Sequence, residues 1–259
     1  MKLIKVFFIF ASLVVSTSYS RAQEQVILKV FYKFSHVRDT LYPNYAYKEN
    51  MVLLVGKNSS EFKSYDRMIH DSVFMASRNI NSLGLTKSGS GGEIFLFPST
   101  ERAMQAEVLV DKYIFPIDYP KIDWKIANDT LSINGLNCQK AIGNWKGRTY
   151  EVWFCADLPF HVGPWKLCGL PGLILKARDL KNQVIFEFAG LQNYRGTLKI
   201  EPPGTAIKTS RVNYTKLHDA FLENPISFIK STMPQISNIK VSSPYVRKPP
   251  INNPLELEK

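Results

Sequence analysis

The stretch GPWKLCGLPGLIL, residues 163–175, organises our interpretation of this chain. Pro171 restricts φ to about −65°, which suits the second position of a tight β-turn. Gly172 is then expected to supply the positive φ that a type II turn needs at its third position. The apolar run 173–177 that follows is typical of a buried strand. The stretch therefore predicts a loop, a tight turn and a core strand, in that order.

Two interpretations of this loop remain open. In the first, the turn is compact because the sheet packs against it. In the second, the loop is a rigid support that presents Trp165 and Lys166 to a partner, next to the strand that carries Trp153. On this view Lys166 is expected to be solvated. The glycine spacing matches neither the P-loop nor the dinucleotide fingerprint, so a phosphate cradle is not expected.

Several blocks of the sequence resemble one known family. The motif Gly169-Leu170-Pro171-Gly172-Leu173-Ile174 resembles the signature that gives the bacterial GLPGLI family its name. Further blocks occur in that family's order: 51–55, 138–141, 147–150, Trp153-Phe154, Leu158-Pro159, Gly163-Pro164-Trp165-Lys166 and 253–257. The resemblance covers nearly the whole chain after residue 22. It implies an envelope protein that serves a partner such as an outer-membrane uptake or export system, and it brings no established biochemistry.

The N-terminus has the pattern of a secretory signal peptide. Lys2 and Lys5 precede an apolar run at 6–15, and a polar stretch ends in Ser20-Arg21-Ala22. A basic start, a short apolar centre and a small residue at the cleavage site define such signals. The apolar run is too short to span a membrane. We expect residues 1–22 to be removed and the mature protein to be periplasmic or secreted.

Removing 22 of the 259 residues leaves 237, enough for one large domain. We expect a single β-rich domain at 23–232 and a proline-rich, extended tail at 233–259. The net charge of +11 falls to +8 without Lys2, Lys5 and Arg21. This excess favours an anionic envelope surface, or is ordinary solubilising charge. A nucleic-acid partner does not fit an exported chain, and no nucleic-acid fingerprint occurs.

The hydrophobic pattern predicts a mainly β fold, a curved antiparallel sheet with a few helices, one of them near the C-terminus. Apolar and polar residues alternate over 25–35, as in a half-buried strand. Other expected strands are 51–55, 94–97, 108–115, 123–127 and 184–188. A helix is expected over 64–80. Another is expected over 214–223, capped by Asn213 or Thr215, and a short one over 226–229.

Residues 136–144 and 148–155 are expected to form a hairpin, which allows two registers. A three-residue turn with Gly147 in the left-handed conformation pairs Asn144 with Arg148 and gathers the apolar residues on one face. A two-residue turn shifts the pairing by one residue and mixes the faces. The first register is favoured. It points Cys138 and Cys155 to opposite faces, whereas the second places them opposite each other.

Three cysteines in an exported chain suggest one disulfide and one free thiol. The favoured register makes Cys155 and Cys168 the expected pair, a bridge that would hold the loop against the strand. Cys138 with Cys155 is the rival pair of the other register. A third possibility is that all three thiols are reduced and buried.

The sequence predicts no catalytic residue, metal ligand or cofactor. Its four histidines lack metal-ligand spacing, and neither a nucleophile elbow nor a zinc-binding helix motif occurs. His161 lies seven residues before Cys168, so a thiol–imidazole pair is conceivable. We expect a non-enzymatic binding or accessory module for a peptide, lipid or outer-membrane partner. The alternative is a periplasmic hydrolase or thiol-dependent enzyme whose site the sequence does not reveal.

Overall fold

The computed structural model describes residues 24–77, 86–232 and 251–258. Its elements are β1 (Glu24–Gln25), β2 (Leu28–His36), β3 (Tyr47–Val55), β4 (Ser60–Ser64), α1 (Tyr65–Ser77), β5 (Glu93–Phe97), the 3-10 turn η2 (Pro98–Thr100), β6 (Arg102–Val108), β7 (Lys112–Ile117), β8 (Lys125–Ile133), β9 (Leu136–Trp145), β10 (Arg148–Cys155), β11 (Leu173–Asp179), β12 (Val184–Asn193), β13 (Lys199–Ile200), β14 (Ile207–Lys208), α2 (Arg211–Glu223) and α3 (Pro225–Thr232). The predicted signal peptide, residues 1–22, lies outside the described residues. So does most of the predicted tail, residues 233–250.

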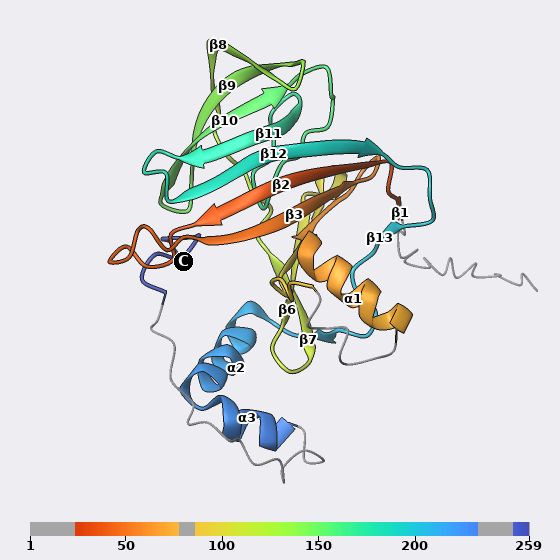
Figure 1. The fold of residues 1–259 in the computed structure, drawn as a ribbon, viewed down its shortest axis with the longest axis vertical. Coiled ribbons are helices and arrows are strands. Elements are labelled where there is room, and N and C mark those ends of the chain that lie inside the picture. Colours follow the sequence, from red (N-terminus) through yellow and green to blue (C-terminus); the bar gives the residue numbers. More distant parts are fainter. Residues whose placement is uncertain (1–23, 78–85, 233–250, 259) are drawn as a thin grey trace, which may run out of the picture.

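Twelve strands form one sheet in the order β14-β7-β6-β5-β4-β3-β2-β12-β11-β10-β9-β8, while β1 pairs with β13. Within the twelve-stranded sheet, all pairings are antiparallel except that of β14 with β7. The sheet is strongly curved: β2, β3 and β8–β12 form a broad surface, and β6 and β7 run away from it toward α2 and α3 (Figure 1). The predicted fold class is confirmed. Among the described residues, no helix combines the length and apolarity needed to cross a bilayer.

The central strand β3 is buried on both faces of the sheet. Met51, Leu53 and Val55 belong to the larger apolar cluster, and Val52 and Leu54 to a smaller one on the opposite face. Successive side chains of a strand point to opposite faces, so this uninterrupted apolar run contributes to both clusters. The smaller cluster also contains Val26, which follows β1, and Ile200 of β13, and Tyr65 and Met68 of α1 pack against it.

The alternation predicted for 25–35 is confirmed in β2, where the inward-facing residues are buried: Leu28, Val30, Tyr32 and Phe34. The expected strand 108–115 is instead divided. β6 ends at Val108 and β7 begins at Lys112, because a tight turn intervenes in which the Leu109 N–H donates to the Asp111 carbonyl. α2 begins earlier than expected, because the hydroxyl of Ser210 caps it by accepting from the Asn213 N–H.

The favoured register of the β9–β10 hairpin is wrong. Arg148 pairs with Trp145 and Tyr150 with Gly143, which is the two-residue-turn register. The turn residues Lys146 and Gly147 have φ of 46° and 79°. Positive φ at both positions defines a type I′ turn, whose twist matches that of the two strands. The preference for this turn type therefore outweighs the gathering of apolar residues on one face that the other register would give.

Candidate functional site

The signature loop 163–175 leads from β10 into β11 and is part of the core. The Gly169 N–H donates to the His161 carbonyl at 3.0 Å, and the Ile174 N–H donates to the Val162 carbonyl at 3.1 Å. The side chains of Leu167, Leu170, Leu173 and Ile174 are fully buried. The loop is compact because its apolar side chains complete the larger apolar cluster.

Gly172 does not have the positive φ predicted for it, whereas Gly169, with φ of 95°, does. A Cβ atom at Gly172 would lie 2.2 Å from the carbonyl oxygen of Cys155. Real Cβ atoms do not approach other atoms so closely. Glycine is required at position 172 because the loop packs directly on the backbone of β10, and not because of its own conformation.

The predicted disulfide between Cys155 and Cys168 is wrong: all three cysteines are free and buried. The thiol of Cys168 faces the carbonyl of Pro120 at 3.5 Å and the hydroxyl of Tyr119 at 4.0 Å. Cys155 instead lies beside Cys138, as the observed hairpin register requires. Burial raises the pKa of both Cys138 and Cys168 to about 11, so neither is an activated thiolate.

Two of the three predicted binding residues, Trp165 and Lys166, are buried. Trp165 is 7% exposed and Lys166 only 4% exposed, so the expectation that Lys166 is solvated is wrong. The ammonium of Lys166 pairs with Glu256 at 2.5 Å, and Arg211 reaches the same carboxylate at 3.0 Å. Trp153 is half-buried on β10, and the Lys140 ammonium lies 5.8 Å from its ring centre.

Burial lowers the pKa of Lys166, and the ion pair with Glu256 opposes that shift. Burial alone would raise the pKa of Glu256, but the charges of Lys166 and Arg211 outweigh it and hold that pKa below its usual value. The two cations therefore stabilise the ionised form of the Glu256 carboxyl group. Lys166 holds a segment from the far end of the chain against the signature loop.

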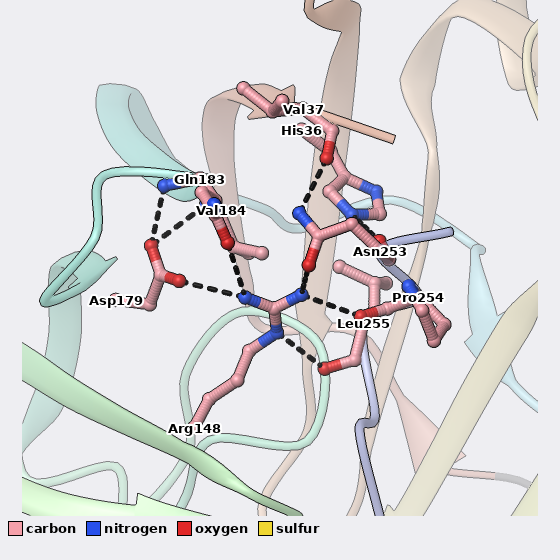
Figure 2. Close-up of polar contacts among 9 residues, drawn as sticks. All are labelled: His36, Val37, Arg148, Asp179, Gln183, Val184, Asn253, Pro254 and Leu255. Carbon is pink, nitrogen blue, oxygen red and sulfur yellow. Dashed lines mark hydrogen bonds and ion pairs between the residues drawn. The ribbon is translucent and has the colours of Figure 1, made fainter. Parts of the chain in front are cut away.

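A second buried cation, Arg148, lies at the start of β10 and makes contacts in two directions (Figure 2). On one side its Nη1 donates to Asp179 at 2.8 Å and to Gln183 at 3.4 Å. On the other side its Nη2 donates to the Asn253 side chain at 2.5 Å and to the Pro254 carbonyl at 2.6 Å. Its side chain is only 1% exposed. A buried guanidinium is tolerated because its donors find acceptors.

Asp179 is itself fixed by backbone donors. Its Oδ1 accepts from the N–H groups of Gln183 and Val184 at 2.6 and 2.9 Å in the turn between β11 and β12. The sequence pointed to Arg148 only as part of a resembling block and as a residue of the expected hairpin, and it gave no role to Asp179. Their signal was weak, because one charged residue at each of two strand ends looks like ordinary surface charge.

The segment 251–258, called here the C-terminal strap, supplies the remaining partners of this cluster. The Nε of Arg148 donates to the carbonyl of Leu255 at 3.1 Å. The N–H groups of Leu257 and Glu258 donate to the Lys146 carbonyl at 2.9 and 3.3 Å. The end of the predicted proline-rich tail is thus bound to the domain.

Two surface hollows flank α1. The first has a volume of about 360 Å³ and is mostly apolar, with Phe31, Met51, Tyr65, Ile69 and Ala189 in its wall. The second, also about 360 Å³, is mixed, with Lys63, Arg67 and Lys112 beside Met68 and Met75. Volumes of this size can hold a small ligand or a side chain of a partner.

The conceivable pairing of His161 with Cys168 is not formed. His161 is exposed in a shallow hollow of about 230 Å³, while Cys168 is buried against Pro120. Within residues 24–77, 86–232 and 251–258, no group of three or more His, Cys, Asp or Glu side chains is placed to hold a metal ion. The geometry therefore draws attention to the hollows beside α1 and to the Arg148 cluster.

Comparison with known proteins gives a fold and no family. No protein-family model matches the chain, and no curated protein does. Two solved structures of PNGF-II, in different crystal forms, are similar in fold, each with a TM-score of 0.52 over 74% of this chain. Sequence identity is 14% and 15%, and the matches cover 33% and 32% of the solved chains. This chain thus spans about a third of the length of those chains, and the likeness concerns the fold alone.

Proposed function

We propose that this chain is an exported envelope protein that works as a non-enzymatic binding module. Its partner is an acidic peptide segment of another envelope protein, and an apolar side chain of that segment enters the apolar hollow beside α1. The signal-like sequence 1–22 and the resemblance to the GLPGLI family support the compartment. The hollow beside α1 is the observation that carries the binding role.

The wall of this hollow is built for an apolar group. The rings of Phe31 and Tyr65 meet edge to face with centroids 5.0 Å apart, and Ile69 lies one turn further along α1. The Thr86 hydroxyl oxygen is buried without a hydrogen-bond partner among the described residues. A mostly apolar wall with a few polar groups is typical of ligand sites, where the polar groups fix orientation.

The helix that forms this wall leaves part of its own apolar surface exposed. Ile69, Phe74 and Met75 of α1 are all exposed, and α1 has no fully buried residue. The N-terminal turn is held firmly, because Asp66 accepts from both the backbone and side-chain nitrogens of Asn50 at 3.0 and 2.9 Å. An anchored helix with an exposed apolar surface is suited to contact a partner.

The charge of the chain selects the sign of the partner. Without residues 1–22 the net charge is +8, which is +11 less Lys2, Lys5 and Arg21, and Lys87 lies in the apolar hollow itself. In the hollow on the other side of α1, Lys63, Arg67 and Lys112 are each paired with a carboxylate, so the selection rests on Lys87 and on the net charge. Complementary charge raises the rate of encounter and favours an acidic segment over a basic one.

A charged substitution in the hollow tests this role. We expect anilinonaphthalene sulfonate, an apolar anionic fluorophore, to bind the purified chain at one saturable site. Ile69→Asp should weaken that binding by about tenfold or more, since it places a carboxylate in the apolar wall. Ala76→Asp is the matched control, with the same charge change on an exposed residue of α1 outside both hollows. Equal binding by both variants would exclude the hollow as the site.

The partner and the compartment need separate experiments. A photocrosslinking residue at position 69 in living cells should capture an envelope protein, and the same residue at position 76 should not. The captured protein should then bind the purified chain and lose binding with Ile69→Asp. N-terminal sequencing should find a mature chain that begins at or near Gln23. A mature chain that retains the apolar run 6–15 would contradict export with cleavage.

A further inference from the structure

We propose that the surface around Arg148 and Lys166 is a peptide-binding site for an extended Asn-Pro-apolar-Glu segment, and that the C-terminal strap occupies it as a separable ligand. The site is distinct from the hollows beside α1 and does not depend on the proposed function. Its ligand is an uninterrupted stretch of the chain, residues 251–258. Its walls come from β2, from the β9–β10 and β11–β12 turns, and from the signature loop.

The asparagine of the segment is recognised through every polar atom it has. The Asn253 side chain accepts from Arg148 through Oδ1 and donates to the Val37 carbonyl at 2.6 Å through Nδ2. Its backbone N–H donates to the Arg38 carbonyl at 3.2 Å, and its carbonyl accepts from Nε2 of His36 at 2.7 Å. Figure 2 shows the side chain held between Arg148 and Val37. An aspartate could not donate to Val37, and an alanine would leave both groups without their partner.

The next two residues are recognised through their main chain and shape. Arg148 donates to the carbonyls of Pro254 and Leu255, so the guanidinium fixes an extended backbone. A residue before proline is itself driven to an extended conformation, which suits Asn253 at this position. The Leu255 side chain packs against the larger apolar cluster. This position therefore takes an apolar residue.

The glutamate is recognised by charge. Glu256 meets Lys166 at 2.5 Å and Arg211 at 3.0 Å, and Lys166 is buried. A buried cation without an anion is costly, so this position requires a carboxylate. Beyond it, a Cβ atom at Gly147 would come within 2.9 Å of the Leu257 side chain. The glycine of the β9–β10 turn thus also leaves room for the peptide.

Arg148 has partners outside the segment that hold its side chain in place. Arg148 is held by Asp179 and Gln183, and Asp179 is fixed by two backbone N–H groups, none of which belongs to the strap. No strand pairing among the described residues includes the strap. The cation is therefore oriented in advance, and a preorganised site binds with less ordering cost. These are the properties of a receptor that a free peptide of the same sequence can enter.

The experiment uses the full chain with a weakened strap. In the double variant Asn253→Ala, Glu256→Ala, the strap loses its two recognised side chains. A fluorescently labelled peptide with the sequence of residues 251–259 should bind this variant saturably in an anisotropy assay. The wild-type chain should bind the peptide at least about tenfold more weakly, because its own strap competes at a high effective concentration. A peptide with alanine in place of Asn253 should bind the double variant about tenfold more weakly than the unaltered peptide.

The receptor side has a matched pair of variants. Added to the double variant, Arg148→Lys should reduce peptide binding about tenfold or more, since lysine cannot reproduce the fork of donors. Arg178→Lys is the control, because Arg178 bonds to Glu151 and Asn182 on the surface and does not contact the strap. If the double variant does not fold, the peptide should restore its near-ultraviolet circular dichroism, since a ligand of the folded state drives folding.

Each outcome decides the matter. A folded double variant that ignores the peptide, or binds a scrambled peptide equally well, would overturn the proposal. So would an unfolded double variant that the peptide does not restore. Selective binding lost with Arg148→Lys and kept with Arg178→Lys supports it.

Discussion

Replacing Gly172 by alanine should destabilise the protein strongly, although alanine is a small residue. The added Cβ would lie 2.2 Å from the carbonyl oxygen of Cys155 and 2.6 Å from its carbonyl carbon. Ordinary contacts between such atoms begin at about 3.5 Å, so backbone must move by more than about 1 Å. Cys155 is fully buried and paired with Leu173 across β10 and β11, so that movement disturbs the core. We expect a loss of about 3 kcal/mol in the free energy of unfolding, as for severe overpacking.

Gly169→Ala is the matched comparison in the same loop. Gly169 has φ of 95°, so alanine there is strained, but its Cβ would meet nothing nearer than Trp124 at 3.9 Å. Backbone strain of this kind costs about 1–2 kcal/mol. If conformation were the reason for glycine at both positions, the two variants would lose similar stability. Because the reason at 172 is close approach, Gly172→Ala should lose clearly more.

Urea unfolding of the two variants and the wild type measures the difference in the free energy of unfolding, and thermal unfolding measures the melting temperature. For a domain of this size about 1 kcal/mol corresponds to 2–4 °C, so Gly172→Ala should lower the melting temperature by about 6–12 °C. The reasoning is refuted if Gly172→Ala stays within about 0.5 kcal/mol of the wild type, or if Gly169→Ala is the more damaging change.

Three further predictions follow from the buried polar groups. Burial lowers the pKa of His36 from its ordinary value of 6.5 to about 4, so the folded state holds the neutral imidazole. Because the unfolded chain takes up this proton more readily, the free energy of unfolding is highest above pH 6.5 and falls as the pH drops toward 4. The loss should be about 2 kcal/mol at pH 5, and His36→Gln should remove it in unfolding titrations. Lys166→Ala should lower the free energy of unfolding by about 1–3 kcal/mol, because it breaks a buried ion pair. Lys121→Ala, at an exposed ion pair, should lower it by less than about 1 kcal/mol. Equal losses for the two variants in chemical denaturation would contradict this. Because burial raises the pKa of Cys138 and Cys168 to about 11, both should resist alkylation in the native state, and mass spectrometry should count three labelled thiols after denaturation without reductant.

The sequence predicted what depends on local periodicity. The alternation of β2 and the apolar run of β3 follow from side-chain direction along a strand, and both lie where they were expected. The caps and the register depend on smaller differences. The type I′ turn needs positive φ at Lys146 as well as Gly147, and nothing about a lysine indicates that.

The Arg148 cluster could not be predicted because its partners are remote in the chain. Asn253 follows Arg148 by 105 residues, and no periodic pattern connects the two. A lysine such as Lys166 is normally solvated, so its burial beside Glu256 becomes visible only when the two segments meet in the fold. The proline-rich composition indicated an extended tail and did not indicate whether or where it would bind.

The separation between Arg148 and the strap also fixes the order in which the molecule can be completed. Asp179 is synthesised 31 residues after Arg148, whereas Leu255 is synthesised 107 residues after Arg148. At about 5–20 residues per second, the ribosome takes roughly 5–20 s to cover that distance. Until the strap is made, only two of the five final acceptors of Arg148 are available, those of Asp179 and Gln183. The contacts of the C-terminal strap must therefore form last, and a chain interrupted before residue 253 would leave Arg148 without its partners Asn253, Pro254 and Leu255.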